Sequence, residues 1–223
     1  MSSIILQYRK VIAGKLRRGG RSMVEESKSA FGRSSGGGNE GVRSVEAVPP
    51  ENVLEFPPEV GLKFVITKAA SDTGGEFIEI EGTMRAHSAG PPIHVHPQQE
   101  ETYRVMSGTA DVFLDGRWHQ VHAGESLSVP KGAPHTIKNE HEEDVTAMNW
   151  HRPAARFEEF SRTFHRLATS GRIKSLPPKD PSSLVYAAML FTEYEDTQVV
   201  VKPPTFVLRL LAFVGRRLGY RLD

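Results

Sequence analysis

Between residues 60 and 150 the sequence consists of short runs rich in β-branched and aromatic residues, separated by glycine and proline. The runs recur at spacings of about ten residues, and some alternate apolar with polar side chains, as half-buried strands do. Asp115-Gly116 lies between two of them and favours a tight hairpin turn. The predicted strands are residues 63–67, 77–83, 93–96, 102–106, 110–114, 118–122, 126–129, 136–139 and 144–150. Since no helical period fits this region, we expect an all-β core, folded as a sandwich or barrel.

The sequence on either side of these strands divides the chain into three predicted parts. Residues 1–48 form a basic tail and linker, because residues 19–44 contain seven glycines and six serines and have no periodic apolar pattern. The β-rich domain covers residues 49–152, and a helical extension covers residues 153–223. We expect a disordered tail and a cytoplasmic protein. The basic, amphipathic start also fits an organellar transit peptide, so an organellar or membrane-associated location stays open.

Two helices are predicted in the first part of the extension. The first places its apolar residues at helical spacing, with charges on the other face: Phe157, Phe160, Phe164 and Leu167. The second begins at Asp180-Pro181, a dipeptide typical of an N-cap followed by proline at the first helical position. We expect this second helix to bury Leu184, Ala188 and Phe191.

A third helix is predicted after Pro203-Pro204, with Thr205 as its cap, and runs to about Leu218. Residues 206–214 are apolar at eight of nine positions, and three arginines follow: Arg216, Arg217 and Arg221. Packing on the β-domain or on a second subunit is the favoured interpretation. The alternative is a helix that lies in a membrane surface, anchored by those arginines.

The composition limits the classes of function that the chain can serve. A net charge of +1 argues against a general nucleic-acid binder, which needs a clear basic excess. No apolar run approaches the roughly 20 residues that span a bilayer. The sequence has no cysteine, so a metal would have to be held by nitrogen and oxygen atoms alone.

The pattern His94-Val95-His96 is the strongest local sign of chemistry in the sequence. Residues i and i+2 of a strand point to the same face, so both imidazoles project together. Glu101 follows after a turn-forming segment, and strand alternation favours it as a ligand over Glu100. His135 opens a later predicted strand, and three imidazoles with one carboxylate suit a divalent transition metal.

Together these residues resemble the two conserved motifs of the cupin superfamily. The first motif is a histidine pair, a glutamate and a glycine, matched here by His94, His96, Glu101 and Gly108. The second is matched at every position by Gly124, Pro130, Gly132, His135 and Asn139. One departure is Gly90, which lies closer to His94 than the family glycine does, and a glycine there serves a turn rather than the metal. The resemblance covers roughly residues 55–152 and is closest to small, single-domain cupins.

The resemblance implies a jelly-roll β-barrel with one divalent metal ion in its mouth, held by His94, His96, Glu101 and His135. Iron or manganese is the usual metal in the family, and nickel, copper or zinc is less frequent. It also implies a small-molecule substrate or ligand and a homodimer. We expect a dioxygenase-like non-haem metalloenzyme, while isomerase, decarboxylase and cyclase chemistry stay open. The alternative is a non-catalytic module that binds a metal or a small molecule.

Two further residues are candidates for the surroundings of the metal. Tyr103 shares the face of Glu101 and could donate a hydrogen bond to a substrate or simply fill the core. Asn139 could orient a ligand or satisfy backbone groups of a turn. The remaining histidines have no comparable spacing and are interpreted as surface or structural residues: His87, His119, His122, His141, His151 and His165.

Overall fold

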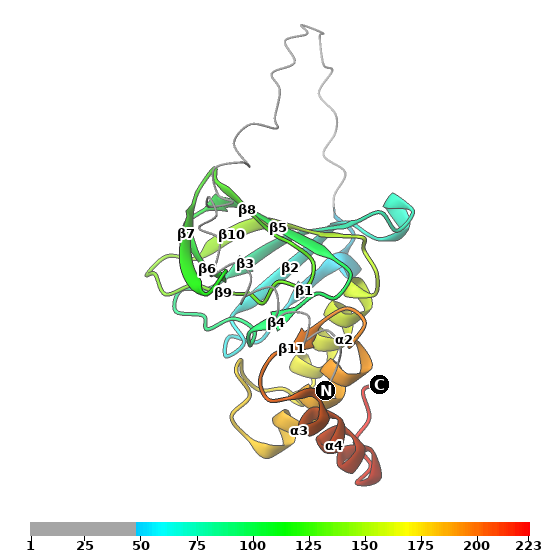
Figure 1. Cartoon of the computed structure of the whole chain (residues 1–223). Helices are drawn as coiled ribbons and strands as arrows, with labels where there is room; N and C mark the ends of the chain where they lie inside the picture. The colour runs from blue at the N-terminus through cyan, green and yellow to red at the C-terminus, as the bar shows by residue number, and fades with distance from the viewer. Residues whose placement is uncertain (1–47) are drawn as a thin grey trace, which may run out of the picture.

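The computed structural model describes residues 48–223, a β-rich part followed by helices (Figure 1). The predicted basic tail and linker lie outside these residues, apart from Val48. The β-rich part contains η2 (Pro50–Asn52), β1 (Val53–Glu55), β2 (Leu62–Lys68), η3 (Ser71–Thr73), β3 (Ile78–Met84), β4 (His94–Val95), β5 (Glu100–Ser107), β6 (Thr109–Leu114), β7 (Arg117–His122), β8 (Ser126–Val129), β9 (Thr136–Lys138) and β10 (Val145–Arg152). The extension contains α2 (Phe157–Thr169), α3 (Pro181–Glu193), β11 (Val199–Val200) and α4 (Thr205–Arg217).

The described strands form three sheets, and every pairing between them is antiparallel. The largest sheet has the order β1-β2-β3-β10-β5-β8, a second has the order β7-β6-β9, and β11 pairs with β4. The predicted β-sheet core with a helical extension is therefore confirmed. The pairings leave the three sheets separate, so the closed jelly-roll barrel stays a prediction.

The hairpin between β6 and β7 shows how the local sequence sets the chain direction. Asp115 and Gly116 have φ values of 53° and 81°, the left-handed conformations that a two-residue hairpin turn requires. Each of the nine predicted strands overlaps one of the described strands. Only β1 and β11 were not anticipated, because strands of three and two residues are too short to show an alternating pattern.

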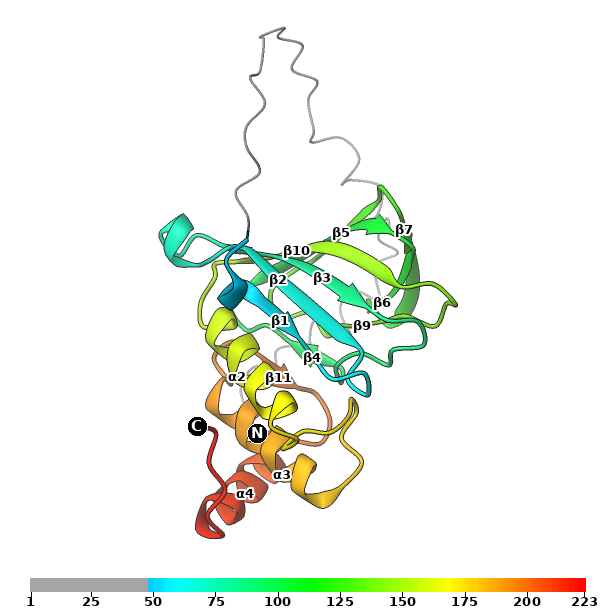
Figure 2. The same cartoon turned by 180° about the vertical axis from the view of Figure 1, so that it is seen from behind.

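The helical extension completes the apolar core at one end of the sheets (Figures 1 and 2). The predicted apolar face of α2 is confirmed, since Phe157, Phe160, Phe164 and Leu167 are all buried. The ring of Phe164 packs against Phe56, with 4.8 Å between the ring centroids. The helix α2 is thus part of the same core cluster as the strands.

The helix α3 begins as predicted, because the Asp180 side chain accepts a hydrogen bond from the backbone N–H of Ser183 at 3.0 Å. Its predicted buried face is only partly correct. Ala188 is fully buried and Phe191 is partly buried against the core, but Leu184 is 46% exposed.

The helix α4 packs on α3 through its small residues and leaves its large apolar residues exposed. Ala212 is buried, and a Cβ atom at Gly215 would approach Val185 to 2.5 Å, so the two helices are close there. The prediction of Thr205 as the cap is wrong, because the capping residue is Pro204 and Thr205 is already helical. The exposed apolar side chains of α4 and its end are Phe206, Leu210, Phe213, Val214 and Leu218. Among residues 48–223 no helix is both long and apolar enough to cross a membrane.

Candidate metal centre

The predicted ligands lie where β4 and the segment leading into β9 are joined. His94 and His135 exchange two backbone hydrogen bonds of 3.0 Å each, so residues distant in sequence become neighbours. The turn before His135 is fixed as well, because the N–H of Gly132 donates to the carbonyl of His96 at 2.7 Å. Glu101 enters from the start of β5. Strand pairing thus brings all four predicted ligands to one place.

Gly90 lies in the turn that leads into β4. Its φ is 68°, and a Cβ atom at this position would overlap the carbonyl oxygen of Ile137. The position therefore requires glycine for the conformation and close approach of the backbone, in agreement with the expected turn role.

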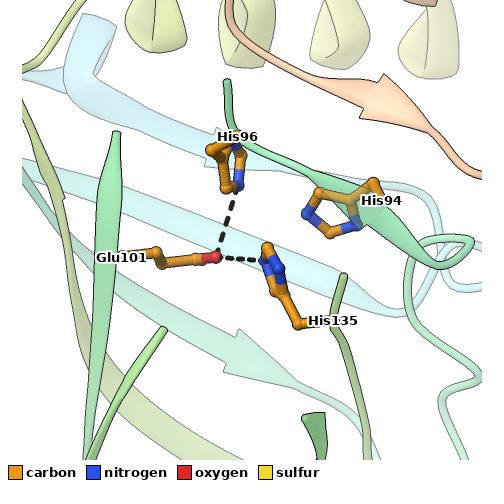
Figure 3. A group of neighbouring side chains, drawn as sticks. All are labelled: His94, His96, Glu101 and His135. Atoms are coloured by element: carbon orange, nitrogen blue, oxygen red, sulfur yellow. Dashed lines mark hydrogen bonds and ion pairs between the residues drawn. The ribbon is translucent and has the colours of Figure 1, made fainter. Parts of the chain in front are cut away.

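The four side chains point toward one another inside the protein (Figure 3). One ligand atom from each of His94, His96, Glu101 and His135 lies within 4.8 Å of the others, and all four residues are buried. Glu101 Oε2 is 2.6 Å from His135 Nε2 and 3.3 Å from His96 Nε2. A group of this composition and size could hold one metal ion.

Backbone carbonyls fix the orientation of the three imidazole rings. The Nδ1 atom of each ring lies 2.8–2.9 Å from a carbonyl oxygen, and these carbonyls belong to Pro92, Thr197 and Ala133 for His94, His96 and His135 respectively. A carbonyl can only accept a hydrogen bond, so each Nδ1 carries the proton. In the neutral ring, Nε2 is then the atom with a free lone pair.

This arrangement leaves electron pairs directed at a common point. The Nε2 atom of His96 has no hydrogen-bond partner although it is buried, and the Nε2 atom of His135 is close to the Glu101 carboxylate. Buried lone pairs of this kind are costly unless a proton or a cation lies between them. The donor set of three nitrogens and one oxygen therefore fits a divalent transition metal.

Strand alternation correctly distinguishes Glu101 from Glu100. Along β5, Glu101, Tyr103 and Val105 are buried, whereas Glu100 is exposed. Burial by itself would raise the pKa of Glu101, yet its electrostatic interactions with His151, His135 and His96 hold that pKa well below its usual value. Glu101 is thus present as a carboxylate, the form that binds a metal.

Two residues of β10 belong to the site and were not predicted from the sequence. Asn149 Nδ2 donates a hydrogen bond of 2.9 Å to Glu101 Oε1, which leaves Oε2 directed at the histidines. His151, interpreted from the sequence as a surface or structural residue, is fully buried with its Nε2 atom 3.4 Å from the same Oε1. The reason is register, since His151 lies directly opposite Glu101. Asn149 lies inside the predicted strand 144–150 and His151 one residue beyond it, but alternation along one strand does not show which strand it pairs with.

Burial makes the charged form of two of these histidines unfavourable. Desolvation lowers the pKa of His94 well below its usual value, and the nearby His135 and His96 lower it further. Desolvation also lowers the pKa of His151, from 6.5 to about 3. The ring of His151 stacks on Phe157, with 3.5 Å between the ring centroids, so α2 contributes to this apolar environment.

The two predicted neighbours of the metal have different positions. Tyr103 lies beside Glu101, and burial together with the charge of that carboxylate raises the pKa of its hydroxyl well above the usual value. Asn139 satisfies backbone groups of turns, the second of its two expected roles. Its Nδ2 donates to the carbonyls of Met84, Arg85 and Glu143, and its Oδ1 accepts from the N–H of His141. Asn139 therefore stabilises backbone turns rather than a ligand.

The fold and the site define a β-sheet protein with a buried group of three histidines and one glutamate. Residues 81–152 match the family model of the cupin domain. The chain therefore carries a cupin domain, as its two motifs predicted. A comparison with curated protein sequences gave no match.

Similar solved structures match part of this chain at low sequence identity. KdgF from Halomonas sp. is 16% identical with a TM-score of 0.41, covering 48% of this chain and 91% of its own. A predicted oxalate decarboxylase from Thermotoga maritima is 15% identical with a TM-score of 0.40, covering 41% and 80%. The cupin domain of an XRE family transcriptional regulator from Enterobacter cloacae is 15% identical with a TM-score of 0.37, covering 41% and 96%.

Proposed function

We propose that His94, His96, Glu101 and His135 bind one divalent transition metal ion, with iron or manganese as the first candidates. One observation carries this proposal: ligand atoms of three buried histidines and one buried glutamate lie within 4.8 Å of one another, and the carbonyls bonded to each Nδ1 leave the Nε2 lone pairs free. Nickel, copper and zinc accept the same donor set and are the other candidates.

On this basis we propose a metal-dependent enzyme of dioxygenase-like type that acts on a small organic molecule. When bound, such a metal polarises an oxygen-bearing substrate or activates dioxygen. The residues around it supply orientation: backbone carbonyls fix the histidine rings, and Asn149 fixes the carboxylate. Isomerase, decarboxylase and cyclase reactions use similar sites, and fold alone does not choose among them.

The experiment that tests this function begins with the metal content of the purified full-length chain. We expect close to one iron or manganese ion per chain by elemental analysis, followed by oxygen uptake with at least one compound in a panel of phenols. A chain that holds stoichiometric metal but turns over none of these compounds would support the alternative, a non-catalytic module that binds a metal or small molecule. A chain without bound metal that cannot be loaded would contradict the proposed metal site and the enzyme function that depends on it.

We also propose a homodimer that covers the exposed apolar side of α4. Phe206, Leu210 and Phe213 on this helix are each more than half exposed, and such a continuous apolar surface favours association. Light scattering on the full-length chain should give twice the monomer mass of 24.7 kDa. The double variant Leu210→Glu, Phe213→Glu should give the monomer mass. A wild-type monomer would contradict the dimer, and sedimentation of that monomer with anionic vesicles would instead favour the membrane-surface alternative.

A further inference from the structure

A cavity of about 350 Å³ adjoins the candidate metal centre. His94, His96 and Glu101 form part of its wall, together with Tyr103 and Asn149 from the neighbouring strands. Its volume lies at the lower end of the range for small-molecule sites. A molecule bound in this cavity would therefore lie next to the proposed metal.

Much of the remaining wall is built by the helical extension, outside the residues that match the cupin family. The helix α2 contributes Phe157, Phe160 and Phe164, and α3 contributes Ala187 and Phe191. The same extension reaches the site through β11, since the carbonyl of Thr197 accepts the Nδ1 hydrogen bond of His96. The cavity thus depends on residues that the family motifs do not specify.

The described lining has almost no group that could compensate a charged ligand. Apart from the three metal-site residues, its only charged side chain is Lys202, which belongs to an exposed residue. No arginine contributes to it, and most of the wall consists of aliphatic and aromatic side chains. A carboxylate or phosphate placed among those side chains would lose its hydration without a counter-charge, which is strongly unfavourable.

We propose that this cavity selects an uncharged, mainly hydrophobic molecule of one or two rings that presents one oxygen atom to the metal centre. The phenylalanines of α2 offer ring faces and edges for aromatic contact. The uncharged polar side chains of the described lining are Tyr103, Asn149 and Gln198, which can donate hydrogen bonds to such an oxygen. The metal-facing part of this statement rests on the proposed function, while the preference for an uncharged apolar molecule rests on the cavity alone.

The test compares two probes of the same shape, 2-naphthol and 2-naphthoate, by titration calorimetry on the full-length chain. Titrations are made with the metal-loaded protein and again after chelation, because a carboxylate could bind the metal directly. We expect the chelated protein to bind 2-naphthol at least about tenfold more tightly than 2-naphthoate. Equal binding of the two probes, tighter binding of 2-naphthoate or no detectable binding of 2-naphthol would overturn the proposal.

Two variants connect this binding to the cavity. Ala187→Leu fills part of the space and should weaken 2-naphthol binding by about tenfold or more, with a thermal melt to confirm folding. Leu184→Lys changes a lining residue that is already 46% exposed, so it should fold and reduce the preference for the uncharged probe. The matched control is Met106→Lys, at a residue of β5 outside the lining that is 53% exposed, and it should leave both affinities unchanged.

The outcomes separate this proposal from the metal proposal. If elemental analysis finds no metal but the chelated protein still prefers 2-naphthol, the proposed enzyme function fails and the cavity assignment stands. If metal binds but neither Ala187→Leu nor Leu184→Lys alters the binding of 2-naphthol, the probe lies elsewhere and the cavity assignment fails.

Discussion

The His135→Ala variant is expected to bind its metal at least about 100-fold more weakly than the wild type. Loss of groups that merely orient a ligand costs 10- to 100-fold, so loss of a ligand itself should reach or exceed the upper limit. Of the three histidines, His135 lies closest to Glu101, with 2.6 Å between His135 Nε2 and Glu101 Oε2. Its removal therefore also leaves the carboxylate without its shortest contact. Elemental analysis and competition with a chelator of known affinity measure the change.

The matched control for this experiment is His87→Ala. His87 is an exposed histidine paired with Glu142, and its removal should leave the metal content unchanged. Circular dichroism of both variants checks that each is folded. Equal metal binding by the folded His135→Ala variant and the wild type would refute the proposed ligand set.

The chelated protein is expected to lose stability steeply as the pH falls below 6.5. Above this value His151 is neutral in both the folded and the unfolded chain. Between pH 6.5 and about 3, only the unfolded chain takes up the proton, because burial lowers the pKa of folded His151 to about 3. This one group should decrease the free energy of unfolding by about 1.4 kcal/mol per pH unit in that window. The lowered pKa of His94 acts in the same direction.

Urea denaturation of the chelated protein at pH 7, 6, 5 and 4 measures this dependence. The His151→Leu variant should show a shallower dependence than the wild type, by about 1.4 kcal/mol per pH unit. The control variant His87→Leu, at an exposed position, should follow the wild type. An unchanged slope in His151→Leu would show that His151 does not contribute to the acid sensitivity.

Local patterns were sufficient to predict most of the elements of the fold. Alternation of side chains identified Glu101 rather than Glu100, and the start of α3 followed from Asp180 and Pro181. These features depend on residues only a few positions apart, where backbone geometry determines which side chains share a face. The exposure of Leu184 departed from expectation because burial depends on packing between elements, and the start of α4 departed by one residue, within the usual uncertainty of a helix end.

The cluster of His94, His96, Glu101 and His135 could be predicted from the sequence alone because the spacing of these residues repeats two motifs. Asn149 and His151 could not, because their proximity to Glu101 comes from the register between β5 and β10. The apolar cavity likewise exists only where α2 and α3 pack against the end of the sheets. Such contacts join residues far apart in sequence, so the tertiary structure alone decides them.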